Sequence, residues 1–131
     1  MKVTADTNVL IRAAVQDDPV QGKIAARLLT EAKLITIALP SLCEFVWVLR
    51  KIYDYKTTDI STAIRVLLAT HNVEMNNPAV EAGLNVLEAG GDFADGVIAY
   101  EGSWLGADTF VSFDKKAVKI LSSQGISARL L

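Results

Sequence analysis

The stretch LITIALPSLCEFVWVLRKIY, residues 34–53, decides the fold class of this chain. Its first part, Leu34–Leu39, is a short apolar run typical of a buried strand. Pro40 breaks that strand, and Ser41 begins a helix that we expect to reach Tyr53. A buried strand followed by a helix is the building unit of α/β proteins with parallel sheets.

The same alternation of strand and helix continues on both sides of this stretch. Helix starts are marked by capping residues and by proline in the first turn, as at Asp18 and Pro19. The pattern predicts one α/β domain over residues 1–131 with a mainly parallel sheet. Further strands are expected at residues 3–5, 109–113 and 126–130, and further helices at 19–33, 57–68, 77–87, 92–105 and 114–125.

Apolar residues at helical spacing predict which helix faces are buried. In the helix over residues 19–33, Ile24 and Leu28 belong to such a stripe. In the helix that begins at Asp92, Ile98 and Ala99 are expected on the core side. The large aromatic side chains Phe45, Trp47 and Trp104 are also expected mostly in the core, although the helix from residue 41 to 53 is apolar enough to form an interface as well.

Composition limits the function classes. Half of the 131 residues are apolar, the formal net charge is −2 and the pI is about 5.3, so charge alone does not hold this chain on nucleic acid. A single cysteine, Cys43, excludes an internal disulfide. The start MKVTADTN has no apolar signal region, and no apolar run is long enough for a membrane span. We therefore expect a cytoplasmic protein.

Carboxylates are spread along the chain at points where strands end or helices begin: Asp6, Glu44, Asp92, Asp95 and Asp114. In open parallel sheets, ligands bind beyond the carboxyl ends of the strands, so the topology favours convergence of these acids. Carboxylates held close together stay ionised only beside cations. Mg²⁺ and Mn²⁺ prefer oxygen ligands, and an all-carboxylate site is typical of phosphodiester hydrolysis.

Each acid also has a purely structural explanation. Asp6 and Asp114 are typical helix N-caps. Ser41 and Glu44 fit a capping box. The acids at 92 and 95 occupy a first helical turn, where the helix dipole favours negative charge. No single motif decides between the two explanations, and the functional hypothesis depends on the ordered set.

That ordered set resembles a known family. The segments DTNVL (6–10), PSLCE (40–44), DFADGVIA (92–99) and SFDKKA (112–117) are similar to the motifs of PIN-domain ribonucleases. Within that family, the chain resembles the VapC-type toxins of bacterial toxin–antitoxin pairs. The resemblance extends over the whole chain and implies a three-layer α/β/α sandwich with a mainly parallel central sheet.

The resemblance also implies an Mg²⁺- or Mn²⁺-dependent endoribonuclease. Asp92 matches an additional acid, and which of Asp92 and Asp95 binds metal directly stays open, with Asp95 favoured. Gly96 departs from the family pattern, which usually has a better helix former there. The family's four catalytic and metal-binding acids correspond to Asp6, Glu44, Asp95 and Asp114, and its supporting polar positions to Thr7, Asn8 and Ser112.

Substrate and partners follow from the same resemblance. RNA phosphates need basic side chains, and Arg12, within two turns of Asp6, is the best candidate. The family implies a homodimer and a cognate antitoxin that blocks the acidic site. Other candidate phosphate contacts are Arg50, Lys51, Lys115, Lys116 and Lys119, of which Lys116 and Lys119 are expected on a solvated face.

Two other functions fit parts of the sequence. The first is a non-catalytic PIN-like module that binds RNA or protein and uses its acids only as helix caps. The second is a hydrolase of small phosphoesters. Against the second, Asp6-Thr7-Asn8 lacks the second aspartate of the Asp-x-Asp signature of haloacid dehalogenases.

Overall fold

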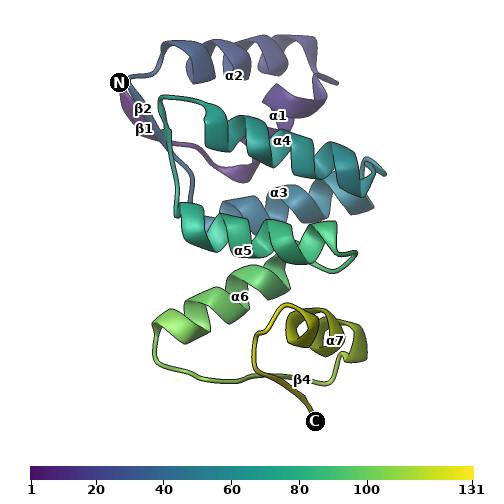
Figure 1. The fold of residues 1–131 in the computed structure, drawn as a ribbon. Helices are drawn as coiled ribbons and strands as arrows, with labels where there is room; N and C mark the ends of the chain where they lie inside the picture. The colour runs from purple at the N-terminus through teal and green to yellow at the C-terminus, as the bar shows by residue number, and fades with distance from the viewer. The chain divides into compact units, whose positions relative to one another are not determined.

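The structure is a computed structural model that describes all 131 residues. It contains seven helices and five short strands (Figure 1), which divide into two compact units, Met1–Asn77 and Pro78–Leu131. The first unit contains β1 (Lys2–Thr4), α1 (Thr7–Val15), α2 (Pro19–Glu31), β2 (Leu34–Thr36), α3 (Leu39–Lys51), α4 (Thr57–Ala69) and β3 (Val73–Glu74). The second contains α5 (Asn77–Glu88), which begins at the boundary, α6 (Phe93–Trp104), β4 (Phe110–Ser112), α7 (Lys115–Ser123) and β5 (Ala128–Leu130).

The first unit is built on a parallel three-stranded sheet in the order β1-β2-β3. Ile35 of β2 pairs with Val3 on one side and with Val73 on the other, and it is fully buried. Helix α1 packs against α2 and α3, and α3 packs against α4. Phe45 and Leu49 of α3 are both buried in this core, which fixes the position of the helix.

The second unit has a separate parallel pair of strands, β4 and β5, in which Val111 lies opposite Arg129. Helix α7 packs against both strands. A small core of Val86, Ile120 and Leu121 is completed by half-buried apolar side chains from α6 and from the inner face of the strands: Ala99, Phe110 and Ala128.

Helices α5 and α6 approach each other very closely in the second unit. A Cβ atom at Gly96 would collide with the carbonyl oxygen of Ala82 and would lie 2.8 Å from the Cα atom of Gly83. A Cβ atom at Gly83 would in turn lie 2.6 Å from the ring of Phe93, which is fully buried. Glycine at 96 is therefore required by the packing of the two helices, and it holds the start of α6 against α5.

The predicted α/β class and the parallel pairing are confirmed, while the strands form two hydrogen-bonded sheets, one in each unit. The predicted helices are all present, whereas α1 and the two-residue strand β3 were not predicted. The burial predictions are wrong for Ile98, Trp47 and Trp104, which are exposed to 56%, 57% and 82%, whereas Phe45 is in the core as predicted. Ile24, which has helical spacing in α2, is exposed to 64%. No helix combines the length and apolar character needed to cross a bilayer.

Candidate functional site

Asp6 and Thr7 lie directly after β1, where the chain turns into α1. Asp6 is the N-cap of α1, and its Oδ1 accepts a hydrogen bond from the backbone N–H of Val9 at 3.1 Å. The capping explanation for Asp6 is therefore confirmed. Its carboxylate is nevertheless exposed, and a capping carboxylate keeps free lone pairs for a further partner.

Glu44 lies on α3 and points its carboxylate to the same place. The hydroxyl of Thr7 donates to Oε2 of Glu44 at 3.3 Å and has the backbone oxygen of Ser41 at 3.4 Å as a second acceptor. The predicted capping box is wrong, since α3 begins at Leu39, two residues before Ser41, and has no side-chain cap. Glu44 consequently sits in the second turn, where helix capping does not explain its presence.

In the second unit, three of the predicted acids lie at the starts of α6 and α7. Asp92 is the N-cap of α6 and accepts from the N–H of Ala94 at 3.1 Å. Asp114 is the N-cap of α7. Asp95 follows one turn into α6 and has no capping role. The cap prediction for Asp114 is confirmed, and so is the predicted place of Asp92 and Asp95 at the start of a helix, where the helix dipole favours negative charge.

The other two acids affect the ionisation of Asp95. Its pKa is raised, first by partial burial, then by the negative charge of Asp92 and then by that of Asp114. Partial burial removes water that would stabilise the ionised form, and two like charges add to that effect. A carboxylate in such surroundings is stabilised by a cation. This feature makes the start of α6 the best candidate for a functional site.

Ser112 supports this site by positioning Asp114. Its Oγ accepts a hydrogen bond from the backbone N–H of Asp114 at 2.9 Å, at the end of β4. The carboxylate of Asp114 then caps α7 through the N–H groups of Lys116 and Ala117 at 2.9 and 3.2 Å. The strand end, the serine and the helix start thus fix the direction of this side chain.

The chemistry of the donors fits a hard divalent cation, because all of them are carboxylate oxygens and one is destabilised by its neighbours. The positions of these carboxylates support a cation site less fully than their donor chemistry does. Neither unit brings three or more His, Cys, Asp or Glu side chains into a position to hold one metal ion. Of the predicted site residues, Asp6, Thr7 and Glu44 belong to the first unit, and Asp92, Asp95, Ser112 and Asp114 belong to the second.

Arg12 belongs to a network that the sequence did not indicate. Its guanidinium donates to Gln21 at 2.8 Å, to Asp17 at 3.3 Å and to the hydroxyl of Tyr53 at 3.4 Å, while that hydroxyl donates to Asp17 at 2.8 Å. The bond to Tyr53 is the main reason why the pKa of Arg12 is raised. A phosphate would have to compete with these partners. Tyr53 lies 41 residues away in sequence, so no local pattern signals the contact.

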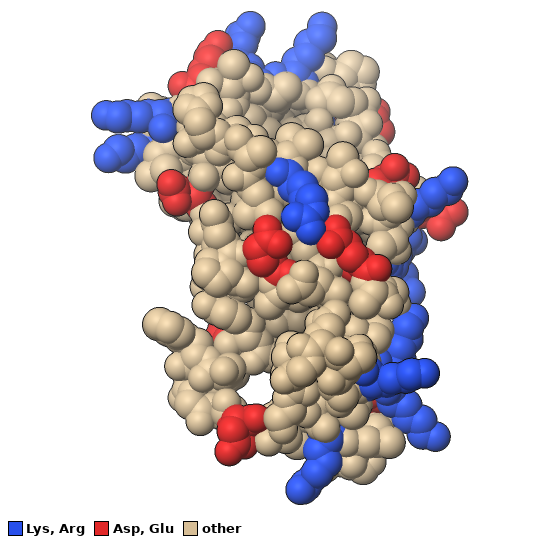
Figure 2. Space-filling view, in the orientation of Figure 1, with Lys and Arg blue, Asp and Glu red and all other residues tan.

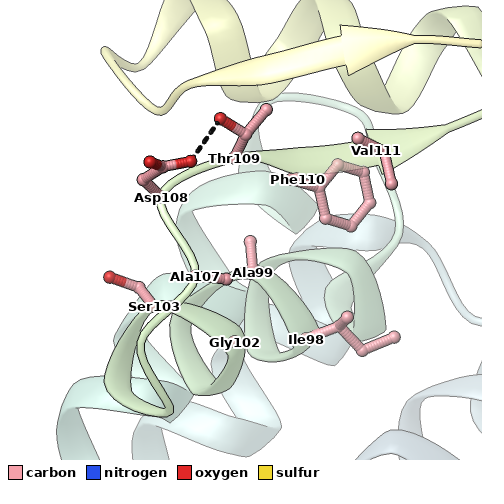
Figure 3. Close-up of a pocket in the computed structure, with 9 residues that line it drawn as sticks. All are labelled: Ile98, Ala99, Gly102, Ser103, Ala107, Asp108, Thr109, Phe110 and Val111. Atoms are coloured by element: carbon pink, nitrogen blue, oxygen red, sulfur yellow. Dashed lines mark hydrogen bonds between the residues drawn. The ribbon is translucent and has the colours of Figure 1, made fainter.

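The pockets of the chain do not coincide with the predicted acids. A pocket of about 270 Å³ lies between α6 and residues 107–111, where Ser103, Asp108 and Thr109 form its polar end (Figure 3). Thr109 donates to Asp108 there at 2.9 Å. In the first unit, Asn8 and Arg12 line a pocket of about 200 Å³ between α1 and α2. None of the candidate metal ligands lines either pocket.

The two units differ in charge. The first has nine basic and eight acidic residues, a formal net charge of +1, and the second has four basic and seven acidic residues, a formal net charge of −3. On the face shown in Figure 2, much of the surface is uncharged, and a basic side chain near the centre lies between acidic ones. Overall charge therefore does not identify a nucleic-acid surface in this view.

Comparison with known proteins yields no family model that matches the chain and no significant match among curated proteins. The case for the candidate site therefore depends on the residues of this chain alone.

Proposed function

We propose that this chain is an Mg²⁺- or Mn²⁺-dependent endoribonuclease with a PIN-like three-layer α/β/α fold. Asp6, Glu44, Asp95 and Asp114 would hold the cation, and Asp92 would support them. The four sequence motifs that resemble PIN-domain ribonucleases support this proposal. The same resemblance supports a toxin of a toxin–antitoxin pair, with a homodimer and a cognate antitoxin as partners.

The observation that carries the proposal is the state of Asp95. It is a half-buried carboxylate in the first turn of α6, and its pKa is raised by burial and by the charges of Asp92 and Asp114. Carboxylates whose pKa is raised by burial and by neighbouring acids are found at many functional sites. Glu44 adds a second acid that has no capping role and is held by Thr7.

The residues have separate tasks in phosphodiester hydrolysis. Asp95 and Asp114 would supply negative charge, Thr7 would hold Glu44 in place, and Ser112 would fix the direction of Asp114. A divalent cation, when bound, supplies a Lewis acid that offsets charge on the phosphate and makes water more acidic. No protein nucleophile is then needed, which agrees with the lack of a Ser/His or Cys/His pair in the motifs.

Metal-dependent RNA cleavage tests this function. Purified protein is incubated with total transfer RNA and Mn²⁺ or Mg²⁺, with EDTA as a control, beside Asp6→Asn. Asparagine also caps helices, so this variant is expected to keep its fold while it loses a charged ligand. Cleavage by the wild type alone, abolished by EDTA, supports the proposal. Equal cleavage by both proteins would exclude Asp6 from the reaction.

The alternative is a non-catalytic PIN-like module that binds RNA or protein. One observation favours it, namely that Asp6, Asp92 and Asp114 all cap helices and thus have a structural use. Under this alternative, a folded protein with Mn²⁺ present cuts neither transfer nor ribosomal RNA. Asp95→Asn would then change stability alone.

A further inference from the structure

A pocket in the second unit lies between the end of α6 and the chain that leads into β4 (Figure 3). Its walls are held by backbone hydrogen bonds. The N–H of Ala107 donates to the carbonyl oxygen of Gly102 at 2.9 Å, and the N–H of Phe110 donates to that of Ser127 at 2.9 Å. The first bond ties the connection to α6, and the second ties the start of β4 to the segment before β5. The pocket of about 270 Å³ is therefore formed before any ligand arrives.

One end of this pocket offers hydrogen-bond acceptors that the chain leaves unused. Thr109 donates its hydroxyl to Oδ1 of Asp108 at 2.9 Å, whereas Oδ2 of Asp108 has no hydrogen bond or ion pair within the chain. The hydroxyl of Ser103 has no partner within the chain either. Asp108 is the only charged residue among those that line the pocket. This end consequently carries one negative charge and free oxygen lone pairs, and no basic residue lines it.

The other end of the pocket is apolar and open. Ile98 of α6 and Val111 of β4 line it and are 56% and 51% exposed, and the half-buried ring of Phe110 lies at the same end (Figure 3). Gly102 also lines the pocket, and a Cβ atom there would have no other atom within 4 Å. An apolar group that entered the pocket would cover these side chains, so the hydrophobic effect favours its binding.

A ligand that satisfies both ends needs a cationic head with N–H groups and a compact apolar body. An ammonium group is a point charge with three donors, which suits one free carboxylate oxygen and hydroxyl oxygens at the same end of the pocket. We propose that this pocket binds a small primary amine in its ammonium form, with an alkyl or arylalkyl body against Ile98, Phe110 and Val111. Such an amine is protonated at neutral pH, since its pKa is close to that of lysine.

Other ligand classes fit this pocket less well. A guanidinium group binds a carboxylate best through both oxygens, and one oxygen of Asp108 already accepts from Thr109. A quaternary ammonium group lacks donors and is recognised by cages of several aromatic rings, whereas Phe110 is the only aromatic residue in the lining. Phosphates and nucleic acid are disfavoured, because the lining contains a carboxylate and no basic residue.

The pocket is separate from the acids of the candidate site. Asp95 lies in the first turn of α6 and Ser103 in its last, while Asp114 follows β4 and Asp108 precedes it. Opposite ends of the same helix and the same strand therefore carry different groups of residues. The inference does not depend on the proposed ribonuclease function.

An amide NMR titration of the full chain tests the proposal and reports where the ligand binds. The probe is phenethylamine at neutral pH, compared with the neutral phenethyl alcohol and the anionic hydrocinnamate, which have similar bodies. We expect phenethylamine to shift the amides of residues 98–111 with a Kd of about 0.1–1 mM, a range suited to a ligand of so few atoms. The alcohol lacks the charge and is expected to bind about 5- to 10-fold more weakly, and the carboxylate more weakly still.

Two variants alter the pocket in different ways. Gly102→Leu places a side chain in the open space and is expected to weaken binding by at least about 10-fold, because it fills the pocket. Asp108→Asn removes the charge and is expected to weaken binding by about 5- to 10-fold. Asp108 is exposed, so Asp108→Asn decides the question alone if Gly102→Leu does not fold.

Glu101→Gln is the matched control, since it removes one negative charge from the same turn of α6 at an exposed residue that does not line the pocket. It is expected to bind phenethylamine like the wild type. A dispersed amide spectrum shows for each variant that the chain is folded.

Several results would overturn the inference. These are no shifts in the wild type at a large excess over the expected Kd, shifts confined to residues outside 98–111, equal affinity for the alcohol, or full affinity in Asp108→Asn. Equal losses in Asp108→Asn and Glu101→Gln would mean that net charge alone attracts the amine. The amide of Nα-acetyl-lysine is the last probe, and tighter binding of it than of phenethylamine would assign the pocket to a lysine side chain of a partner protein instead.

Discussion

The ionised form of Asp95 is disfavoured in the folded protein, and this makes stability depend on pH. Its pKa is raised from 3.8 by burial and by Asp92 and Asp114, so the folded protein holds this proton more tightly than the unfolded chain does. The carboxyl therefore contributes stability below pH 3.8 and loses that contribution as the pH rises through the raised value. Without divalent cations, we expect Asp95→Asn to unfold at a higher temperature than the wild type at pH 7.

The matched variant is Glu101→Gln, which also removes one negative charge from α6 at an exposed position. Thermal unfolding at pH 4 and pH 7 compares the three proteins. The advantage of Asp95→Asn over the wild type should be larger at pH 7 than at pH 4, and at pH 7 Asp95→Asn should also melt above Glu101→Gln. An Asp95→Asn protein that melts below the wild type at pH 7 would show that the charge of Asp95 stabilises the fold.

Asp114 allows its two roles to be separated. Alanine removes the cap of α7 and is expected to cost about 1 kcal/mol of unfolding free energy. Asparagine keeps the cap acceptor, so Asp114→Asn is expected to stay within about 0.5 kcal/mol of the wild type. Urea unfolding measures both. If both variants lose the same stability, the carboxylate charge and not the cap is what stabilises α7.

At the scale of elements, the close crossing of α5 and α6 gives opposite expected effects on stability when two glycines of α6, Gly96 and Gly102, are each replaced by alanine. Alanine is a better helix former than glycine by about 1 kcal/mol. At Gly102, where nothing lies within 4 Å of an added Cβ, we expect Gly102→Ala to stabilise by about 0.5–1 kcal/mol. At Gly96 the same change meets the backbone of α5, and we expect a loss of about 1–3 kcal/mol.

Both glycine variants are measured by urea unfolding. Loss of stability in Gly96→Ala together with a gain in Gly102→Ala would confirm the close crossing. A gain in both would mean that the start of α6 does not touch α5 as closely as the structure has it. Gly96 has low helix propensity, and its presence is explained by the packing of α6 on α5. It follows Asp95 directly in the sequence.

The helices were predictable because their signals are local. Asp18 with Pro19, Asn77 with Pro78 and the N-cap at Asp92 mark three starts that the structure reproduces. Helix α1 was missed because residues 9–15 are almost continuously apolar and show no clear period. Strand β3 has two residues, which is too short for an alternating pattern.

Which side chains are buried and which distant residues they contact was less predictable, since both depend on distant parts of the chain. Ile24 and Ile98 have helical spacing that suggests burial, yet both are exposed. Glu44 fits a capping box by sequence, but α3 starts before Ser41 and the glutamate meets Thr7, 37 residues earlier in the chain. Such contacts come from tertiary packing, which a short motif does not contain.

At the scale of the whole molecule, the charges are unevenly distributed along the chain. Net charge is −2, yet the four basic residues of the second unit lie in the fifteen residues that follow Asp114. The sequence could indicate each acid and its cap. It could not indicate that Asp95 is the acid whose pKa is raised by burial and by its neighbours, because that depends on the packing of α6.

The most direct measurement is the initial rate of transfer RNA cleavage in Mn²⁺ by the wild type, Asp95→Asn and Asp108→Asn. Asp108 is an exposed acid of the same unit and serves as the control. We expect the wild type and Asp108→Asn to cleave at the same rate and Asp95→Asn to be slower by at least about 100-fold, since a lost carboxylate removes several kcal/mol of charge stabilisation. Cleavage by Asp95→Asn at the wild-type rate would contradict the proposed carboxylate site.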